Sequence, residues 1–295
     1  INKALYSPDG RWIATASDDM TARVWDAVSG KEIYVFDNHF GALWDVTFSR
    51  DSSRLLTASV DGTARIWSLE SGNQVALLSG HTNTVAMARF SDNGKCVVTA
   101  GSHDNTARVW SAETGQVIAI MRGHTARVDA VAISPDGQWI ATASEDGTAR
   151  IWAVFGFEYA LFHTYRDYIH SLAISSSGRF VATNGFYVND SSGIPMIYRR
   201  YEVYVWDARL GQVVTRLSGS ESSPDNIEIS PDDRWIVTYH EDEEKLWSWA
   251  ADTGARLSEW QMTGISLDQV RFAHNSSVLC AIASDQRVLC WSVPD

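Results

Sequence analysis

The chain is poor in cysteine and has neither a long apolar run nor an excess of positive charge. Its 295 residues include three cysteines without a CxxC pair, which excludes a zinc ribbon and a multi-disulfide framework. Cys280 and Cys290 flank one short turn, so a cross-strand disulfide is open to them. Reduced thiols are the plainer interpretation, and they favour a cytoplasmic location. No apolar run reaches the roughly 18 residues that a membrane span needs, so no membrane partner is expected.

The net charge of −12 at pH 7 argues against a nucleic-acid partner, because affinity for phosphate backbones comes chiefly from Lys and Arg. It suits a partner with a basic patch. The sequence also has no glycine-rich phosphate loop, no zinc-ligand spacing and no dinucleotide fingerprint. No cofactor and no metal are therefore expected.

What the chain does have is an internal repeat marked by tryptophan. Seven tryptophans end short β-branched runs at intervals of 42 or 43 residues, with one interval of 54, at Trp25, Trp67, Trp110, Trp152, Trp206, Trp249 and Trp291. A period in the low forties is typical of a four-stranded sheet copied around an axis. The function is then sought in recognition rather than catalysis.

The fourth copy, residues 123–152, shows the unit most clearly. Its segments AVAIS and WIATAS alternate as strands do, PDG between them predicts a hairpin turn, and EDG before TARIW predicts a second tight turn. These are strands a, b and c. A weaker outer strand d follows the SG or TG turn of each copy, at Gly30, Gly72, Gly115 and Gly254.

These residues resemble the WD-repeat β-propeller family over essentially the whole chain. The family's marks are the Gly-His pairs at 80–81 and 123–124, the strand-c Trp, and the Asp of the b–c turn, present here as Asp19, Asp61, Asp104, Asp146, Asp242 and Asp285. The resemblance implies an all-β, seven-bladed propeller with four-stranded antiparallel blades. The near-identical TARVW and TARIW copies look like bacterial arrays, which commonly belong to larger signalling proteins.

One domain of residues 1–295 is predicted. Its blades cover approximately residues 1–36, 37–79, 80–122, 123–162, 163–217, 218–260 and 261–295. Aligned on the fourth copy, Ile1 already lies inside strand a, and the seventh copy stops after strand c. We expect the last blade to lack its outer strand within this chain and more protein to precede Ile1.

A Ser, His and Asp set recurs in three copies and imitates a hydrolase triad. An enzyme rarely needs three identical sites side by side. In the resembling family such a set joins the strand-c Trp in a structural tetrad, in which the loop His bridges the strand-b hydroxyl and the turn Asp. The predicted tetrads are His39, Ser59, Asp61 and Trp67; His81, Ser102, Asp104 and Trp110; and His124, Ser144, Asp146 and Trp152.

Functional residues are sought where the repeat is broken, and the largest break is an insertion in blade five. Trp206 follows Thr183 by 23 residues, whereas Trp152 follows Thr142 by 10. The insertion combines aromatic, aliphatic and Arg residues that are common in interfaces. Either it binds a partner or it is a longer hairpin that packs over its own blade. Its candidate partner-binding residues are Phe186, Tyr187, Ile194, Met196, Ile197, Tyr198, Arg199, Arg200 and Tyr201.

Smaller departures lie in the d–a loops, which share a face with the b–c turns in the resembling family. Phe40, Trp44, Arg127 and Tyr168 have no counterparts of their kind in the other copies and could extend an aromatic surface with the insertion. Repeats five to seven lose tetrad members, since Tyr165, Ser220 and Thr263 stand where His is expected. The acidic run at residues 241–244 is either a solvated turn or a docking point for a basic segment.

The sequence thus predicts a non-catalytic protein–protein interaction module that binds a protein or peptide through the b–c/d–a loop face. By resemblance it is the sensor or scaffold domain of a larger signalling protein, and the partner could be another domain of the same longer chain. The alternative is a permanent structural subunit of a multiprotein assembly. An enzyme is not expected.

Overall fold

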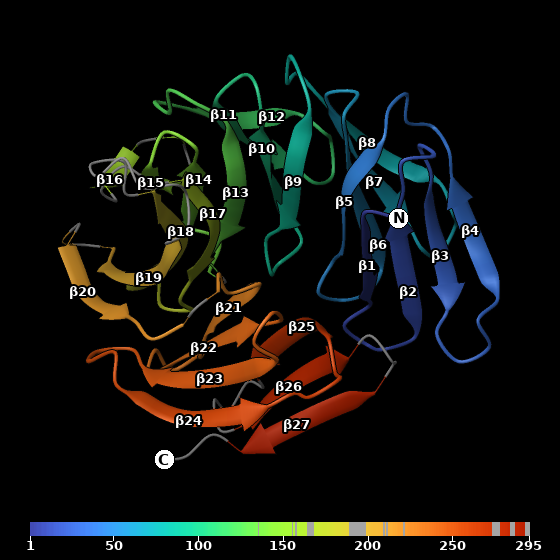
Figure 1. Ribbon diagram of the computed structural model, residues 1–295. Helices are drawn as coiled ribbons and strands as arrows, with labels where there is room; N and C mark the ends of the chain where they lie inside the picture. The colour runs from blue at the N-terminus through green and yellow to red at the C-terminus, as the bar shows by residue number, and fades with distance from the viewer. Residues whose placement is uncertain are drawn as a thin grey trace. The chain divides into compact units, whose positions relative to one another are not determined.

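The computed structural model describes the chain except residues 135, 155, 157, 164–167, 189–198, 209, 211, 221, 273–277, 284–286 and 293–295. For residues 158–163, 168, 170–171, 185–188, 199–202, 268–269 and 282 it describes the backbone alone. The described residues form strands and turns without a helix. They make seven antiparallel sheets that follow one another along the chain (Figure 1). The predicted all-β, seven-bladed class is confirmed.

The first four sheets each have four strands that are neighbours in chain order. Sheet one contains β1 (Lys3–Tyr6), β2 (Trp12–Ala16), β3 (Ala22–Asp26) and β4 (Glu32–Phe36). Sheet two contains β5 (Leu43–Phe48), β6 (Arg54–Ser59), β7 (Thr63–Ser68) and β8 (Gln74–Ser79). Sheet three contains β9 (Val85–Phe90), β10 (Cys96–Gly101), β11 (Thr106–Ser111) and β12 (Val117–Arg122). Sheet four contains β13 (Val128–Ile133), β14 (Trp139–Ser144), β15 (Thr148–Ala153) and β16 (Glu158–His163).

Sheets five and six repeat this plan, and sheet seven has three strands. Sheet five contains β17 (Tyr168–Ile174), β18 (Phe180–Val188), β19 (Arg199–Asp207) and β20 (Gln212–Leu217). Sheet six contains β21 (Asn226–Ile229), β22 (Trp235–His240), β23 (Lys245–Ala250) and β24 (Arg256–Gln261). Sheet seven contains β25 (Leu267–Phe272), β26 (Val278–Ala283) and β27 (Val288–Ser292).

In sheets one to six, the turn between the first and second strands is fixed by a serine. In sheet one, the Ser7 hydroxyl donates to Asp9 at 2.6 Å and accepts the backbone N–H of Trp12 at 2.9 Å. Ser134 makes the same pair of contacts with Asp136 and Trp139. The serine and aspartate of the SPDG segments therefore act as a side-chain clamp on the hairpin.

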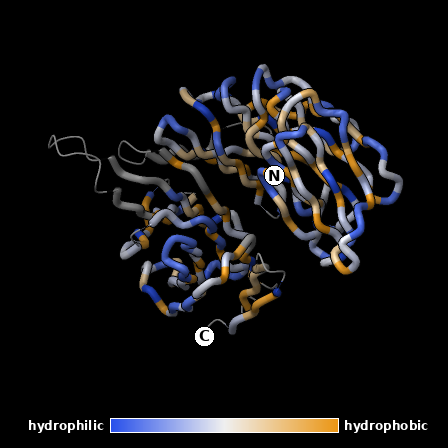
Figure 2. Tube along the Cα trace, turned by 45° about the vertical axis from the view of Figure 1, so that its right-hand side comes forward, coloured by the Kyte–Doolittle hydropathy of each residue, from blue (hydrophilic) through white to orange (hydrophobic). Residues whose placement is uncertain are grey.

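The strand-c tryptophans of sheets two and three pack each of these sheets on the one before it. The colouring of Figure 2 changes between hydrophobic and hydrophilic along individual strands, as expected of strands with one buried face. Trp67 of sheet two lies in one core cluster with Ala14 and Val24 of sheet one. Trp110 of sheet three likewise packs with Ile66 of sheet two. These tryptophans are 2% exposed, so the repeated aromatic is a core residue between sheets.

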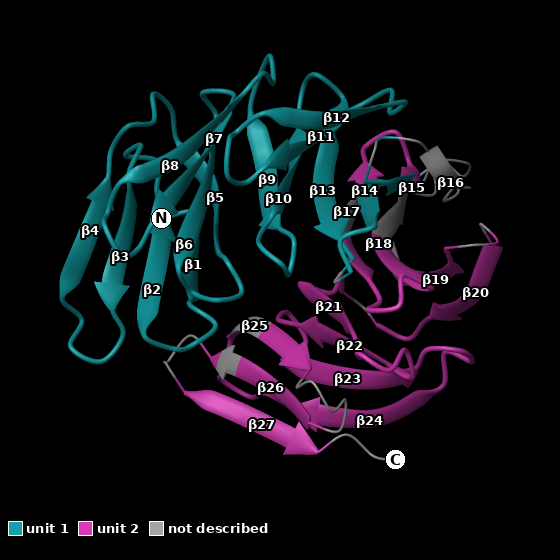
Figure 3. Cartoon of the chain, turned by 180° about the vertical axis from the view of Figure 1, so that it is seen from behind, with its two compact units in different colours: residues 1–142, 152–158 teal, residues 143–151, 159–295 magenta. Residues whose placement is uncertain are grey.

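Two compact units divide the chain, residues 1–142 with 152–158 and residues 143–151 with 159–295 (Figure 3). Sheets one, two and three belong to the first unit, and sheets five, six and seven to the second. The assignment of all 295 residues to one domain with the predicted blade boundaries stays a prediction.

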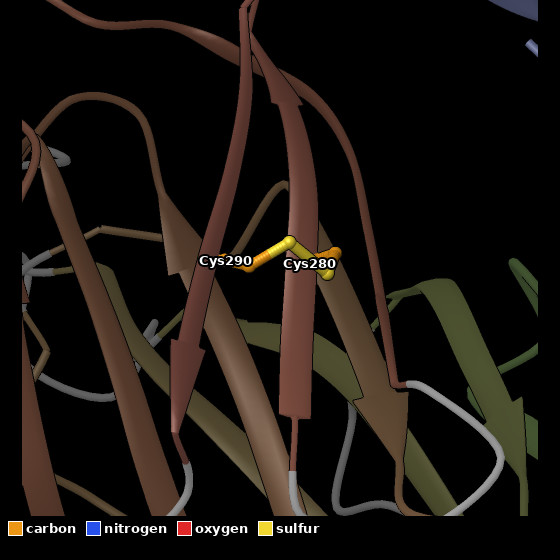
Figure 4. Close-up of a disulfide and its surroundings, with 2 residues drawn as sticks. All are labelled: Cys280 and Cys290. Atoms are coloured by element: carbon orange, nitrogen blue, oxygen red, sulfur yellow. A yellow bond between two sulfur atoms is a disulfide. The ribbon is translucent and has the colours of Figure 1, made fainter.

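A disulfide joins the second and third strands of sheet seven (Figure 4). Cys280 and Cys290 are directly opposed in the β26–β27 register, with their Cα atoms 4.2 Å apart. Cys96, in β10, is the free cysteine. The expectation of reduced thiols at 280 and 290 was wrong, because the short turn brings the two side chains to one register position on one face.

The insertion of blade five lengthens two strands into a ribbon. β18 and β19 have nine residues each, and their register continues through Phe186 opposite Tyr201, Tyr187 opposite Arg200 and Val188 opposite Arg199. Tyr168 of β17 lies opposite Phe186 on the other side. Part of the insertion is thus the longer hairpin that the sequence left open, and three aromatic residues share one register row.

Candidate functional site

A buried hydrogen-bond network occupies one end of each of the sheets two and three. In sheet three, His81 Nε2 lies 2.7 Å from the Thr99 hydroxyl, and His81 Nδ1 lies 2.7 Å from Asp104. The Trp110 indole donates to the same Thr99 oxygen at 2.8 Å. Sheet two repeats the arrangement around Thr57, with corresponding distances of 2.8, 2.8 and 3.0 Å.

The shared hydroxyl belongs to a threonine, not to the predicted serine. Ser59 and Ser102 lie at the end of the strand, beyond the position that faces the imidazole. Ser59 donates to the Gly41 carbonyl and accepts the Asp61 N–H, and Ser102 Oγ is buried without a hydrogen-bond partner among the described residues. In sheet four, His124 Nε2 and the Trp152 indole likewise meet Thr142, while Ser144 accepts the Asp146 N–H. Thr57 and Ser59 are two residues apart on one strand and share a face, so alternation could not choose between the two hydroxyls and the position along the strand decides.

Asp61 and Asp104 are held ionised by the same networks. Burial alone would raise the pKa of Asp61, but hydrogen bonds from His39 and Thr63 and from the Phe40 N–H outweigh it. The pKa of that carboxyl therefore lies well below its ordinary range, and Asp104 behaves alike beside His81. A carboxylate that accepts several hydrogen bonds stays charged in spite of burial.

These networks have the geometry of structural supports rather than of a hydrolase site. The side chains of His39 and His81 are 0% exposed, so no substrate reaches the imidazole. Each histidine also has both ring nitrogens engaged, one by Thr and one by Asp. A general base needs a free path to the proton that it removes.

Sheet six contains the same kind of network with its members exchanged. Its imidazole, His240, comes from the end of β22, where sheets one, two and four have serine, and a loop serine, Ser220, stands where the loop histidine is expected. His240 Nδ1 lies 2.9 Å from Ser220 Oγ, and Nε2 lies 3.1 Å from Thr238. Ser220 in turn donates to Glu243 at 2.6 Å, and the Trp249 indole donates to Thr238.

The exchange was missed in the sequence because Ser220 stands where the Gly-His pair would have its histidine. Its signal was a histidine at the strand-b serine position opposite a loop serine. Burial holds the pKa of His240 at about 4, so the imidazole is neutral at pH 7. A cavity of about 10 Å³ beside Ser220 and His240 has room for about one water molecule, which makes it too small for a substrate.

Exposed apolar residues gather at the ends of sheets one and two where the second strand turns into the third. We call Met20, Phe40, Trp44 and Val60 the Trp44 surface; they are 46%, 86%, 40% and 39% exposed. Three hydrogen bonds hold its segments together: Leu43 N–H to the Ser17 carbonyl, Val60 N–H to the Ala42 carbonyl, and Phe40 N–H to Asp61. The two β-turns and the loop between the sheets therefore form one rigid platform.

Met20 is held in a strained backbone conformation on this platform. Its φ is +70°, and the matching turn positions are taken by Gly62 at +81°, Asn105 at +55°, Gly147 at +75° and Glu244 at +51°. A long side chain in this region costs about 1–2 kcal/mol relative to the right-handed conformation. Strain at an exposed apolar residue is an observation that points to function.

Trp44 is the extra residue of a β-bulge. The β5–β6 register passes from Leu43 opposite Ser59 to Asp45 opposite Ala58, which leaves Trp44 unpaired between them. Bulges re-aim a side chain at the edge of a sheet. The corresponding bulged residue in sheet three is the small Ala86, so the tryptophan is an addition to the repeated scaffold.

The other predicted partner-binding residues are not brought to this platform by any described contact. Arg127 forms an ion pair with Asp129 at 2.6 Å. Phe186, Tyr187, Arg199, Arg200 and Tyr201 lie in the sheet-five ribbon with Tyr168 beside it, and Ile194, Met196, Ile197 and Tyr198 lie outside the described residues. Met20 and Val60 were missed in the sequence, although comparison of the turn residues across copies would have revealed both.

The part of the chain that the structure describes contains neither a metal-binding cluster nor a membrane-spanning helix. No group of three or more His, Cys, Asp or Glu side chains there is placed to hold a metal ion. No helix there is long and apolar enough to cross a membrane.

The comparisons with known proteins agree with the repeated network. The WD40 family, described as "WD domain, G-beta repeat", matches residues 1–26, 30–68, 72–111 and 115–153. The Notchless protein homolog of Arabidopsis thaliana is 44% identical over 41 residues, which are 14% of this chain and only 9% of that protein. Together with the seven sheets and the His, Thr, Asp and Trp networks, these matches show that the chain belongs to the WD-repeat family.

Proposed function

We propose that this chain is a non-catalytic protein-interaction module that binds a protein or peptide at the loop ends of its sheets. WD repeats generally mediate protein–protein interaction or scaffolding. The observation that carries the proposal is the contrast between the buried, repeated networks and the exposed residues that break the repeat beside them. Phe40, at 86% exposed, directly follows the fully buried side chain of His39. Irregular residues on a rigid scaffold are the usual carriers of recognition.

The more specific part of the proposal is a sensor or scaffold role within a larger signalling protein. The repeated copies of residues 1–153 supply a rigid frame, and the sheet-five ribbon adds Tyr and Arg residues of the types enriched in interfaces. The second candidate is a permanent structural subunit. It would require a large and apolar obligate interface, whereas the Trp44 surface mixes apolar residues with the exposed carboxylates of Asp18 and Asp37.

Affinity capture with mass spectrometry tests the proposal. The intact protein is compared with a variant in which residues 184–202 are replaced by a short Glu-Asp-Gly turn, and with the variant Trp44→Ala. We expect at least one variant to melt cooperatively like the parent while losing a captured protein. An unchanged set of captured proteins in both variants would refute binding through these loop ends.

The cytoplasmic location expected from the sequence stays a prediction. The Cys280–Cys290 disulfide weighs against it, because disulfides persist mainly in oxidising compartments. Alkylation of the protein in its native source before and after reduction decides the question. Cytoplasmic residence predicts that both cysteines are alkylated without reductant.

A further inference from the structure

We propose that the Trp44 surface binds a peptide segment in which a Lys or Arg side chain stands beside an aliphatic or aromatic residue. This inference rests on the proposed interaction function and specifies the partner's chemistry. Four exposed apolar side chains, Met20, Phe40, Trp44 and Val60, supply the apolar contact. Such a group on one platform marks an interaction site.

The strain at Met20 favours a site over an accident of packing. Gly62 and Gly147 show that this fold accommodates glycine at the same turn position with a positive φ. Methionine there is not a core residue, since 46% of it is exposed. A flexible and polarizable side chain is suited to adapt to a bound segment.

The negative charges beside the Trp44 surface favour a partner segment that carries positive charge. Two exposed carboxylates accompany the platform, Asp18 in the turn that contains Met20 and Asp37 three residues before Phe40, and neither is in an ion pair with any described residue. Asp18 accepts a hydrogen bond from Asn2 at 2.7 Å, which fixes its position beside the Ser17–Met20 turn. The nearby cations are already paired, Lys3 with Asp45 and Arg23 with Asp19 and Glu32.

A peptide cation therefore finds carboxylates and the face of Trp44 unpaired with any Lys or Arg side chain that the structure describes. Charge-assisted hydrogen bonds and cation–π contact both favour Lys and Arg at such a place. An acidic segment would meet repulsion from Asp18 and Asp37 and from a chain of net charge −12. The mixed character of the surface thus fits a basic and apolar linear segment.

The test uses a phage-displayed library of random peptides of about twelve residues, a length that spans a short linear motif. The library is selected on the full 295-residue chain, and enriched peptides are remade with a fluorescent label for polarization titrations. Four variants adopt the residue of another copy or remove one group: Met20→Gly, Phe40→Thr, Trp44→Ala and Asp18→Asn. The control is Val28→Thr, an exposed apolar residue at the opposite turn of sheet one.

We expect the enriched peptides to place Lys or Arg beside an apolar residue. Trp44→Ala should weaken them about tenfold or more, which corresponds to the loss of one anchoring contact. Met20→Gly should weaken binding while leaving the melting temperature equal or higher, so misfolding cannot explain its loss. Asp18→Asn should weaken binding and flatten its salt dependence, and Val28→Thr should change nothing.

The inference is overturned by enrichment of acidic or uncharged peptides, by equal binding of the parent and Trp44→Ala, or by self-association of the chain through Trp44. An unenriched library overturns it as well. Failure of the wider proposal is seen separately, because lysate capture lost in Trp44→Ala would still support protein binding even where the peptide chemistry proved different.

Discussion

At the scale of single residues, the buried hydroxyl of each network decides its stability. Thr99 is 0% exposed and is shared by His81 and Trp110, whereas Ser102 Oγ has no described partner. We expect Thr99→Val to lower the free energy of unfolding by about 2–3 kcal/mol, because it leaves two buried polar groups unsatisfied. Ser102→Ala should be neutral within about 0.5 kcal/mol. Urea unfolding of both variants measures the difference, and equal effects would contradict the threonine-centred network.

His240 makes the stability depend on pH. Burial lowers its pKa to about 4, against an ordinary value of 6.5. Between these two values the unfolded chain binds a proton that the folded chain does not. Stability from this group is therefore complete above pH 6.5 and is lost as the pH falls toward 4, by up to about 3 kcal/mol.

Chemical denaturation between pH 7 and pH 4 measures this loss, with His240→Gln as the comparison. Glutamine can still hydrogen-bond Ser220 and Thr238 but does not titrate. The variant should show a shallower fall in the free energy of unfolding over this window. Parallel curves for the two proteins would show that His240 does not carry the dependence.

At the scale of elements, the c–d turn of one sheet packs on the outer strand of the sheet before it. Gly115 has φ of +72°, and a Cβ there would lie 2.6 Å from the Leu77 carbonyl oxygen of β8. Gly10 has nearly the same φ, +71°, with nothing within 4 Å. It is a control for the conformational strain alone.

We expect Gly10→Ala to cost about 1 kcal/mol from its positive φ and Gly115→Ala about 3 kcal/mol, because the clash with backbone adds to the strain. Thermal or urea unfolding of the two variants reports the difference. Similar destabilisation of both would mean that close contact between the sheets does not require glycine at 115.

The strands were largely predictable because alternation, Ser-Pro-Asp-Gly turns and the Trp period repeat in register. The SG and TG turns were visible for the same reason. The sequence could not show that the insertion of blade five continues the β18–β19 ladder through Val188 and Arg199, because its irregular composition resembles a loop. Nor could it place Cys280 opposite Cys290 with certainty, since a shift of one residue would put them on opposite faces.

At the scale of the molecule, one buried carboxylate links three consecutive sheets of the first unit. Asp45 of β5 has a 4% exposed side chain and lies 2.5 Å from both Lys3 of β1 and Arg89 of β9. It also accepts the Ala88 N–H at 2.9 Å. Burial would raise the pKa of Asp45, but the charges of Arg89 and Lys3 hold it below its ordinary value.

We expect Asp45→Asn to lower the free energy of unfolding by about 2 kcal/mol, less than for a fully buried pair because Lys3 and Arg89 are partly exposed. The matched control is Asp92→Asn, which removes the exposed partner of Arg50 and should cost no more than about 0.5 kcal/mol. Denaturant unfolding at pH 7 compares the two. An equal, small effect would show that the three sheets do not depend on this link.

The candidate site was only partly predictable at this scale. Phe40 and Trp44 stood out as residues without counterparts, but their joining with Met20 depends on the hydrogen bond from the Leu43 N–H to the Ser17 carbonyl, between adjacent repeats. Such contacts join residues from neighbouring repeats, and no single repeat contains them.

The exchanged network of sheet six shows that a repeat can keep its hydrogen-bond network while the residue types that form it change places. Ser220 and His240 hold the positions that histidine and serine hold elsewhere, yet the circuit from Thr238 through the imidazole to an acid remains closed. The family model compares residue types position by position, and it matches the chain through residue 153. The sheets, however, continue to residue 292. Divergent repeats can therefore be recognised by whether every hydrogen-bond donor of the network still has an acceptor. A designer could also exchange the residues of this network within a blade while keeping its backbone.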